Sequence, residues 1–263
     1  MANIVKLKVE KDLKATVKEA LDQLGGLEKY VKSGEKVLLK PNFNTADPPP
    51  ASTDIEFLRT VVELIIETGA QEIIIADSST LALKTKEVME KLGVFELEKD
   101  YPSARVVNFD EGKWIKKEIK RGKYLGCVSI PEILEQVDKL FWLPCLKTHR
   151  IAGFTGALKL AVGCMRPRQR MALHVGHVQE KVAEMNTVIK PDLIIMDGRK
   201  TFIKKGPEVG TVKKPNIILA STNRVAIDIE GIKVIQSYEG NDLAGIDGEE
   251  LPQIKRAREL GIN

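Results

Sequence analysis

Short apolar runs alternate along this chain with longer amphipathic segments. The apolar runs predict strands at residues 1–10, 36–40, 71–77, 139–144, 192–198 and 216–222. Apolar residues at helical spacing predict helices at residues 13–24, 55–68, 86–92, 131–136, 224–235 and 252–260. Strands that alternate with helices in this way are typical of βαβ units. The pattern therefore predicts an α/β fold with a mostly parallel sheet and helices on both faces.

The pattern changes between residues 103 and 130. This stretch is more polar and alternates, as in V-V-N-F-D and W-I-K-K-E-I-K, which predicts an antiparallel ribbon or a small subdomain. A chain of 263 residues can bury a full core. We expect a single domain over residues 1–263, with an inserted portion near residues 100–180 that would give it two lobes.

Composition places the chain among soluble globular proteins, with 43% hydrophobic and 30% charged residues. The first ten residues lack the apolar run of a signal peptide, and no window is apolar enough to span a membrane, so we expect a cytoplasmic protein. The net charge of +4 comes from mixed Lys and Glu, which fits a heat-adapted surface of ion pairs as readily as nucleic-acid binding. Aromatic residues make up only 5%, so a stacking platform for nucleic acid is not expected.

Small polar and charged residues follow most of the predicted strands. Ligands bind beyond the carboxyl ends of the strands in open α/β sheets, so these residues are candidates for a binding cleft. They are Lys40, Asn42, Asn44, Asp77, Ser78, Ser79, Lys147, Thr148, His149, Asp197, Ser221, Thr222 and Asn223. Asp, Ser and Asn also cap helices after strands in any α/β protein, which is the alternative for several of them. Lys40 and Lys147 are harder to explain in that way, because a lysine at the end of an apolar strand needs an anionic partner.

Two further segments suggest an anion site. The run T-G-A-L-K, from Thr155 to Lys159, opens a predicted helix whose free amides would hold phosphate or carboxylate, although the full phosphate-loop pattern is lacking. Three arginines surround Pro167 at positions 166, 168 and 170, in what we expect to be an exposed loop. They are either ligand-binding groups or solvated charges.

The three histidines lie between residues 149 and 177. If residues 171–178 are helical, His174 and His177 share one face, and His149 from a strand end would complete a three-histidine metal site. Neighbouring histidines without a metal are the alternative. Cys145 is a candidate nucleophile if Lys147 or His149 stabilises its thiolate, but buried packing is the expectation for all three cysteines, and no disulfide framework is expected.

Several motifs together resemble the DUF362 family. They are K-P-N-F-N from Lys40, P-A-S-T-D at 50–54, G-A-Q-E-I-I-I-A-D-S-S at 69–79, L-P-C-L-K-T-H at 143–149, the T-G-A-L-K run, N-T-V-I-K-P-D-L-I-I-M-D-G at 186–198, G-P-E-V-G at 206–210 and V-A-I-D at 225–228. The resemblance implies no established general activity. Many similar proteins are labelled iron–sulfur proteins, but three cysteines cannot build a ferredoxin-type cluster from this chain alone. A partner protein that carries a redox cofactor is therefore one candidate.

The resemblance also bears on single residues. The family motif usually has lysine where Cys145 stands, which argues against Cys145 as an essential group, while Lys147, Thr148, His149 and His174 keep the pattern. The overall organisation is similar to that of the nickel-pincer lactate racemase family, whose two-part α/β members place Lys and His around an anionic substrate. We treat that similarity as an analogy.

We therefore expect an α/β protein that binds a small anion, carboxylate or phosphate, with a divalent metal as a second candidate ligand. Lys147, His149 and His174 are the expected catalytic groups. The expected ligand-binding residues are Lys40, Asn42, Asn44, Thr53, Asp54, Asp77, Ser78, Thr148, Thr155, Gly156, Lys159, Arg170 and Asp197. The expected metal ligands are His149, His174 and His177. The alternative is a non-catalytic module whose basic segment 166–170 docks an acidic partner, a cofactor protein or nucleic acid.

Overall fold

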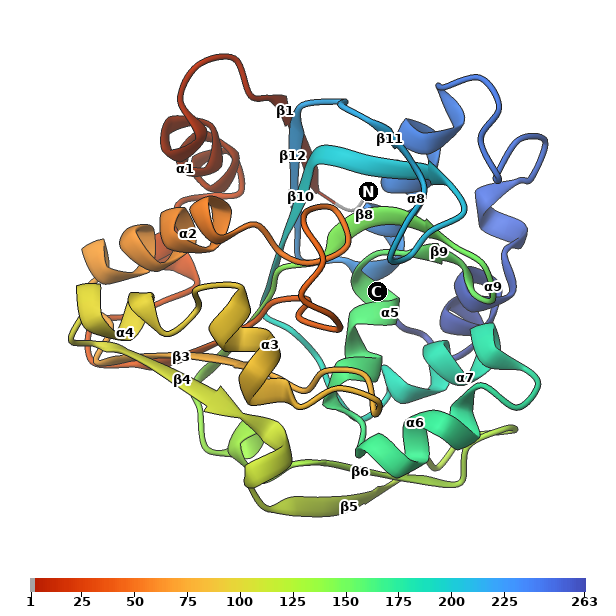
Figure 1. Cartoon of the computed structure of the whole chain (residues 1–263), viewed down its shortest axis with the longest axis horizontal. Coiled ribbons are helices and arrows are strands. Elements are labelled where there is room, and N and C mark those ends of the chain that lie inside the picture. The colour runs from red at the N-terminus through yellow and green to blue at the C-terminus, as the bar shows by residue number, and fades with distance from the viewer. Residues whose placement is uncertain (1–2) are drawn as a thin grey trace.

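A ten-stranded mixed sheet forms the centre of the computed structural model, which describes residues 3–263 (Figure 1). The expected strand residues Met1 and Ala2 lie outside the described range. The main strand order is β1 (Ile4–Lys8), β12 (Ile217–Ser221), β10 (Leu193–Lys204), β7 (Lys139–Trp142), β2 (Lys36–Lys40), β3 (Glu72–Asp77) and β4 (Ala104–Asn108). The five strands from β10 to β4 pair in parallel. β12 and β1 pair antiparallel at the other side.

Further strand pairings extend the same sheet beyond the end of β7. The long strand β10 pairs with β7 at its start and with β8 (Cys145–His149) farther along. β9 (Gly153–Thr155) then pairs antiparallel with β8, and β11 (Thr211–Lys213) pairs with β10. β8 therefore carries Lys147 and His149 past the carboxyl ends of the neighbouring strands.

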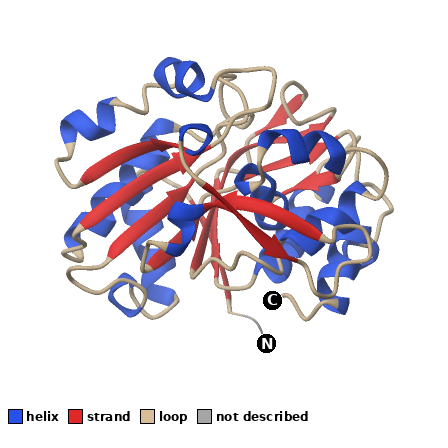
Figure 2. Cartoon of the chain, turned by 90° about the horizontal axis from the view of Figure 1, so that it is seen from below, coloured by secondary structure: helices blue, strands red, loops and turns tan. Residues whose placement is uncertain are grey.

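Helices cover both faces of the sheet, as the apolar pattern predicts (Figure 2). Because side chains alternate along a strand, Val37 and Leu39 of β2 belong to one apolar core and Leu38 to the other. α1 (Leu13–Gln23), α2 (Ile55–Glu67), α3 (Thr85–Lys91) and α4 (Glu96–Asp100) supply the first core. α5 (Ala157–Leu160), α6 (Pro167–Leu173), α7 (Val178–Met185), α8 (Arg224–Gln236) and α9 (Pro252–Glu259) supply the second.

α1, α2 and α8 begin where a side chain accepts a hydrogen bond from a free backbone amide. Asp12 accepts a hydrogen bond from the Ala15 amide at the start of α1, and Asp54 accepts from Phe57 at the start of α2. Asn223 does the same for α8, so capping is the observed role for that residue. These caps explain why the predicted starts of these three helices agree with the structure.

Three details differ from the predicted pattern. The helix predicted at residues 131–136 is a short 3-10 helix at Glu132–Glu135, which follows directly on a strand. β12 runs antiparallel to β10, so Ser221 and Asn223 lie at the opposite edge of the sheet from the ends of the parallel strands. The antiparallel ribbon is present as β5 (Trp114–Glu118) and β6 (Cys127–Pro131), at the lower edge of Figure 1. It starts later than expected, because Ala104–Asn108 pairs in parallel with β3 as the edge strand of the main sheet.

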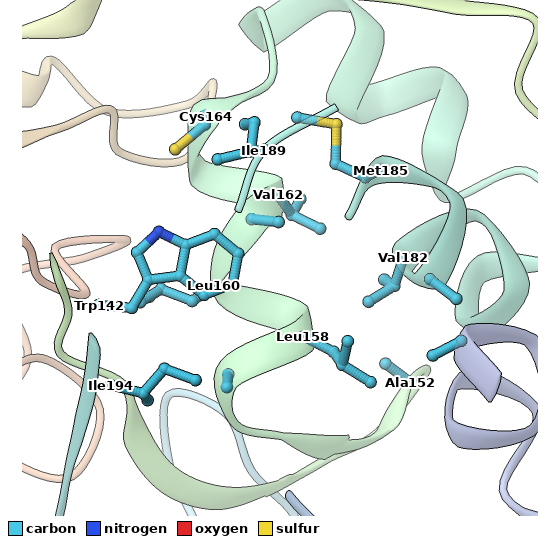
Figure 3. Close-up of a cluster of buried hydrophobic side chains, with 14 of the residues drawn as sticks. Trp142, Ala152, Leu158, Leu160, Val162, Cys164, Val182, Met185, Ile189 and Ile194 are labelled. Atoms are coloured by element: carbon cyan, nitrogen blue, oxygen red, sulfur yellow. The ribbon is translucent and has the colours of Figure 1, made fainter. Parts of the chain in front are cut away.

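The second core fixes the segment that follows β9. Trp142 at the end of β7 is fully buried, and Leu160 of α5 lies beside it, with Leu158 farther along the same cluster (Figure 3). Val182 and Met185 of α7 close the cluster from the far side. This packing holds the chain from residue 157 to residue 185 against the sheet.

A buried ion pair holds α7 to the rest of the molecule. The carboxylate of Glu184 is fully buried and lies 2.7 Å from the Arg256 guanidinium of α9. The same carboxylate accepts hydrogen bonds from the backbone amides of Lys123 (2.7 Å), Tyr124 (3.0 Å) and Leu125 (2.8 Å). One side chain therefore joins two helices and the turn between β5 and β6.

We predict that Glu184→Ala lowers the free energy of unfolding by about 3–5 kcal/mol, because it leaves a buried guanidinium and three amides without their acceptor. Glu250→Ala is the matched control, since Glu250 pairs with Lys255 on the surface, and it should cost less than about 1 kcal/mol. Urea unfolding followed by circular dichroism measures both values. Equal losses for the two variants would contradict the role of Glu184.

Candidate functional site

A cavity of about 250 Å³ lies at the carboxyl ends of β2, β3 and β8. The strands contribute one wall, and the chain from α5 to the end of α6 contributes the other. The polar and charged residues that line it are Lys40, Asn42, Asn44, Asp77, Ser78, Thr80, Lys147, His149, Arg150, Thr155, Lys159, Arg170, His174 and Glu208. Most of the predicted site residues therefore converge on one place.

Lys40 and Asp77 form a buried ion pair across the ends of β2 and β3. Their charged atoms are 2.7 Å apart, and the two side chains are 1% and 2% exposed. Asp77 also accepts hydrogen bonds from the amides of Phe43 and Ser78, each at 2.6 Å. Gly163 passes so close that a β-carbon there would lie 2.7 Å from the Lys40 nitrogen. The charge of Lys40 is thus compensated by the protein itself.

Three other cations of the cavity have no such partner. Within residues 3–263, no carboxylate lies within salt-bridge distance of Lys147, Lys159 or Arg170. Lys147 donates to the carbonyl oxygen of Ala51 at 2.5 Å. Arg170 donates to the carbonyl and hydroxyl oxygens of Ser78. Hydrogen bonds to neutral groups orient these cations but do not compensate their charge.

Burial lowers the pKa of each of these cations. The pKa of Lys159 falls to about 8, through burial and then through the positive charge of Lys147. Burial also lowers the pKa of Lys147 and of Arg170. A bound anion would offset this cost, because it supplies the missing negative charge.

Two buried polar atoms of the cavity wall lack a hydrogen-bond partner among the described residues. They are the hydroxyl oxygen of Thr155 and the Nε of Arg170, on side chains that are 8% and 7% exposed. Buried polar groups are nearly always satisfied in folded proteins. The missing partners of these two atoms therefore indicate that a ligand or water binds in the cavity.

His149 is held as a hydrogen-bond donor. Its Nδ1 accepts hydrogen bonds from the backbone amides of Ile151 and Ala152, each at 3.1 Å. The ring proton is therefore on Nε2. Burial, followed by the charges of Lys159 and Lys147, lowers its pKa to about 2, so the ring is neutral at physiological pH.

His174 has the opposite arrangement. Its Nδ1 lies 2.7 Å from the carbonyl oxygen of Arg170, and a carbonyl can only accept, so this nitrogen carries the proton. In the neutral ring Nε2 is then free to accept a proton. His174 is exposed at the mouth of the cavity, whereas His149 is half-buried. The cavity thus combines one imidazole donor with one imidazole acceptor.

The structure does not bring the three histidines together. The predicted helix over residues 171–178 is wrong, because α6 ends at Leu173 and α7 begins at Val178 after a left-handed residue, His177. His177 is exposed and stacks on Tyr124, with 4.2 Å between ring centroids, outside the cavity. Among residues 3–263 no group of three His, Cys, Asp or Glu side chains is placed to hold a metal. The expected three-histidine site is therefore not formed.

Four other predicted site residues do not line this cavity. The Thr53 hydroxyl accepts from the Asn42 amide at 2.7 Å, and the Thr148 hydroxyl accepts from the Gly206 amide at 3.2 Å. Asp54 and Asp197 both pair with Arg199, each at 2.9 Å, beside a second cavity of about 290 Å³. The expected ligand-binding role of these two aspartates is not supported, because Arg199 already occupies their oxygens.

The helix start in the T-G-A-L-K run is occupied by the protein. The buried carboxylate of Asp228 accepts from the amides of Ala157 (2.5 Å) and Leu158 (3.0 Å). Burial raises the pKa of Asp228 to about 7. A β-carbon on Gly156 would lie 2.2 Å from this carboxylate, which explains the glycine. The prediction that these amides bind a ligand is wrong. The V-A-I-D motif was a signal for this contact, but its partner was not identifiable from the sequence.

The remaining candidates behave as packing and surface residues. Cys145 and Cys164 are buried, and burial raises the pKa of both thiols, to about 12 for Cys164, so neither is an activated nucleophile. The expected loop around Pro167 is the start of α6. Arg166 and Arg168 are exposed on it, while Arg170 turns into the cavity.

Sequence reasoning missed the apolar rim of the cavity. Leu81, Ile151 and Met171 line its mouth and are 48%, 55% and 58% exposed. They come from the segment after β3, the turn after β8 and α6. Single exposed apolar residues give no sequence signal, because only the fold shows that they surround one opening.

Comparisons with known proteins give a family and a fold. Residues 37–233 match the family described as a domain of unknown function, DUF362. The chain is 26% identical over 261 residues to the thylakoid-associated protein sll1697 of Synechocystis sp., covering 95% of this chain and 76% of that protein. None of the helices in residues 3–263 is long and apolar enough to cross a membrane. The cytoplasmic location stays a prediction.

Among solved structures, the fold is similar to that of the lactate racemase apoprotein from Thermoanaerobacterium thermosaccharolyticum, with a TM-score of 0.51. The sequence identity is 14%, and the match covers 86% of this chain. This chain corresponds to only 56% of the racemase chain. The likeness shows a shared α/β fold.

We predict that the two cavity histidines have opposite tautomers in the neutral state. Long-range ¹H–¹⁵N correlation spectra should place the proton on Nε2 of His149 and on Nδ1 of His174. The His149 ring should also stay neutral at pH 5, where an ordinary histidine with a pKa of about 6.5 is charged. Single His→Gln variants at 149, 174 and 177 assign the signals. A doubly protonated His149 ring at pH 5 would contradict the geometry.

Proposed function

This chain belongs to the DUF362 family of domains of unknown function, and we propose that it binds a small anion, carboxylate or phosphate, in the cavity at the ends of β2, β3 and β8. The observation that carries this proposal is the set of three cations without a carboxylate partner, Lys147, Lys159 and Arg170. Burying such charges is unfavourable unless a ligand compensates them. The unpartnered Thr155 hydroxyl and Arg170 Nε supply further donors to the same ligand.

The remaining polar residues orient the anion and the cations. Asn42 and Asn44 present amide groups from the loop after β2. Lys40 acts through its pair with Asp77, which fixes the ends of β2 and β3. Ser78 accepts hydrogen bonds from Arg170, and its hydroxyl donates a hydrogen bond to the Asp110 carboxylate at 2.6 Å. The anion would therefore meet a preformed set of donors.

The histidine pair gives the site a capacity for proton transfer. His149 donates from Nε2, and His174 accepts at Nε2, so we assign His174 the role of base and His149 that of donor. A protein-held metal forms no part of the proposal, because His149 Nε2 carries a proton and His177 is outside the cavity. The reaction, if the bound anion is a substrate, would be one that moves a proton on or off it.

The second candidate is a docking surface for an acidic or redox-active partner. The exposed guanidinium groups of Arg166 and Arg168 favour it. Arg170 does not contribute, because it points into the cavity. If the affinity for a partner falls steeply as the salt concentration rises, this docking mode is favoured. Saturable binding of a small anion that depends only weakly on salt favours the cavity.

We predict that Lys147→Met weakens anion binding at least tenfold while the protein remains folded. The substitution removes a buried cation that touches only one carbonyl oxygen, so stability should be unchanged or higher. Calorimetric titration with inorganic phosphate, succinate and acetate measures the affinity. Arg166→Met is the control, because it removes an exposed cation just before α6 and outside the cavity. Unchanged affinity in the Lys147 variant, or no binding of any of these anions to the wild type, would overturn the proposal.

We also predict that affinity for sulfate falls as the pH rises above about 8. Lys159, with a pKa of about 8, is charged below that value and neutral above it. A bound anion raises this pKa, so binding takes up a proton and weakens by up to about tenfold per pH unit. Sulfate itself does not titrate in this range. In Lys159→Arg the fall should move to higher pH, because arginine stays charged. A pH-independent affinity in the wild type would contradict the role of Lys159.

A further inference from the structure

Basic side chains outnumber acidic ones in the lining of the cavity. The inference drawn below about the ligand rests on the proposed function. The basic residues of the lining are Lys40, Lys147, Arg150, Lys159 and Arg170. The acidic residues are Asp77 and Glu208. Asp77 pairs with Lys40 at 2.7 Å, and Glu208 pairs with Arg150 at 3.5 Å. Lys147, Lys159 and Arg170 are left for a ligand.

More distant carboxylates offset part of this charge. Asp77 and Asp110 act on Arg170 from beyond salt-bridge distance, and the Ser78 hydroxyl accepts a hydrogen bond from Arg170 and donates one to Asp110. The negative charge of Glu208 raises the pKa of Lys147 and of Lys159, but burial lowers each pKa by more. The uncompensated charge therefore comes mainly from the two lysines, with a partial contribution from Arg170.

The free donors also exceed what one carboxylate can accept. An ammonium has three N–H donors, and Lys147 uses one of them on Ala51, while Lys159 has no hydrogen-bond acceptor within residues 3–263. Arg170 adds its Nε–H, and Thr155 adds a hydroxyl. These donors come from β8, β9, α5 and α6. A single carboxylate has two oxygens and one charge, so it would leave at least one cation unmatched.

The cavity is larger than a bare inorganic ion requires, and part of its lining is apolar. A water molecule needs only about 10–15 Å³ measured in the same way, whereas this cavity holds about 250 Å³. Leu160 and Val162 line it together with the donors, and Leu81, Ile151 and Met171 surround its mouth. A carbon skeleton would lie against these apolar side chains with its acid groups turned toward the lysines.

We infer that the ligand is an organic molecule with two negative charges, a phosphate monoester or a dicarboxylate, whose acid groups bind Lys147, Lys159 and Arg170. Both chemistries supply the charge that the cavity lacks. They differ in shape, since a phosphate gathers its oxygens on one atom and a dicarboxylate separates them. Matched ligands distinguish the two.

Calorimetric titrations at pH 7.5 and constant ionic strength compare ligands that differ by one charge. Succinate is compared with butyrate, and propyl phosphate with methyl propyl phosphate. At least one dianion should bind ten times more tightly than its matched monoanion, and the pair that shows this preference identifies the acid group. Equal affinities within both pairs would overturn this inference and leave the anion site standing. Binding of none of the four would overturn the proposed function as well.

Two substitutions of Lys159 test whether the preference depends on the cavity charge. Lys159→Gln removes one cation and should reduce the ratio of dianion to monoanion affinity at least threefold. Lys159→Arg keeps the charge and should retain most of the ratio. Thermal unfolding followed by circular dichroism shows that each variant is folded. A ratio that is the same in the wild type and in the folded Lys159→Gln variant would overturn the assignment of Lys159.

Discussion

The buried pair of Lys40 and Asp77 is the constraint on which the cavity depends. It joins the ends of two parallel strands, and the Asp77 carboxylate also binds the backbone at Phe43 and Ser78. An ion pair this deep is stable only when its remaining hydrogen-bonding capacity is satisfied, and here the backbone supplies the partners. Gly163 can approach because it has no side chain. The floor of the cavity is thus rigid before any ligand binds.

Around this neutral pair, both walls of the cavity carry charge that the protein does not compensate, from Lys147 of β8 and from Lys159 of α5. Lys147 and Lys159 repel each other, and burial penalises both. Such an arrangement lowers the stability of the unliganded protein and favours the bound state, a common balance at binding sites. Packing around Trp142 and the Glu184–Arg256 pair provide the stability that holds the wall with Lys159 in place.

The residues that match the DUF362 family include the whole candidate site. All residues that line the cavity, from Lys40 to Glu208, fall within the matched range 37–233, as does Asp228, which closes the start of α5. The fold neighbour contributes the architecture alone, because 14% identity says nothing of individual side chains. The chemistry of this site therefore has to be argued from its own geometry.

The sequence by itself determined the alternation of strands and helices, the helix caps, the family and the residues at the strand ends, including Lys40, Asp77 and Lys147. These features are local, because burial on one face of a strand or helix leaves a periodic pattern. Only the tertiary structure decided that β12 runs antiparallel, that Asp228 occupies the start of α5 and that Lys40 is paired while Lys147 is not. It also decided the opposite tautomers of His149 and His174 and the separation of His177. Each of these depends on contacts between residues far apart in the chain, or on which backbone group a side chain meets, and periodicity encodes neither.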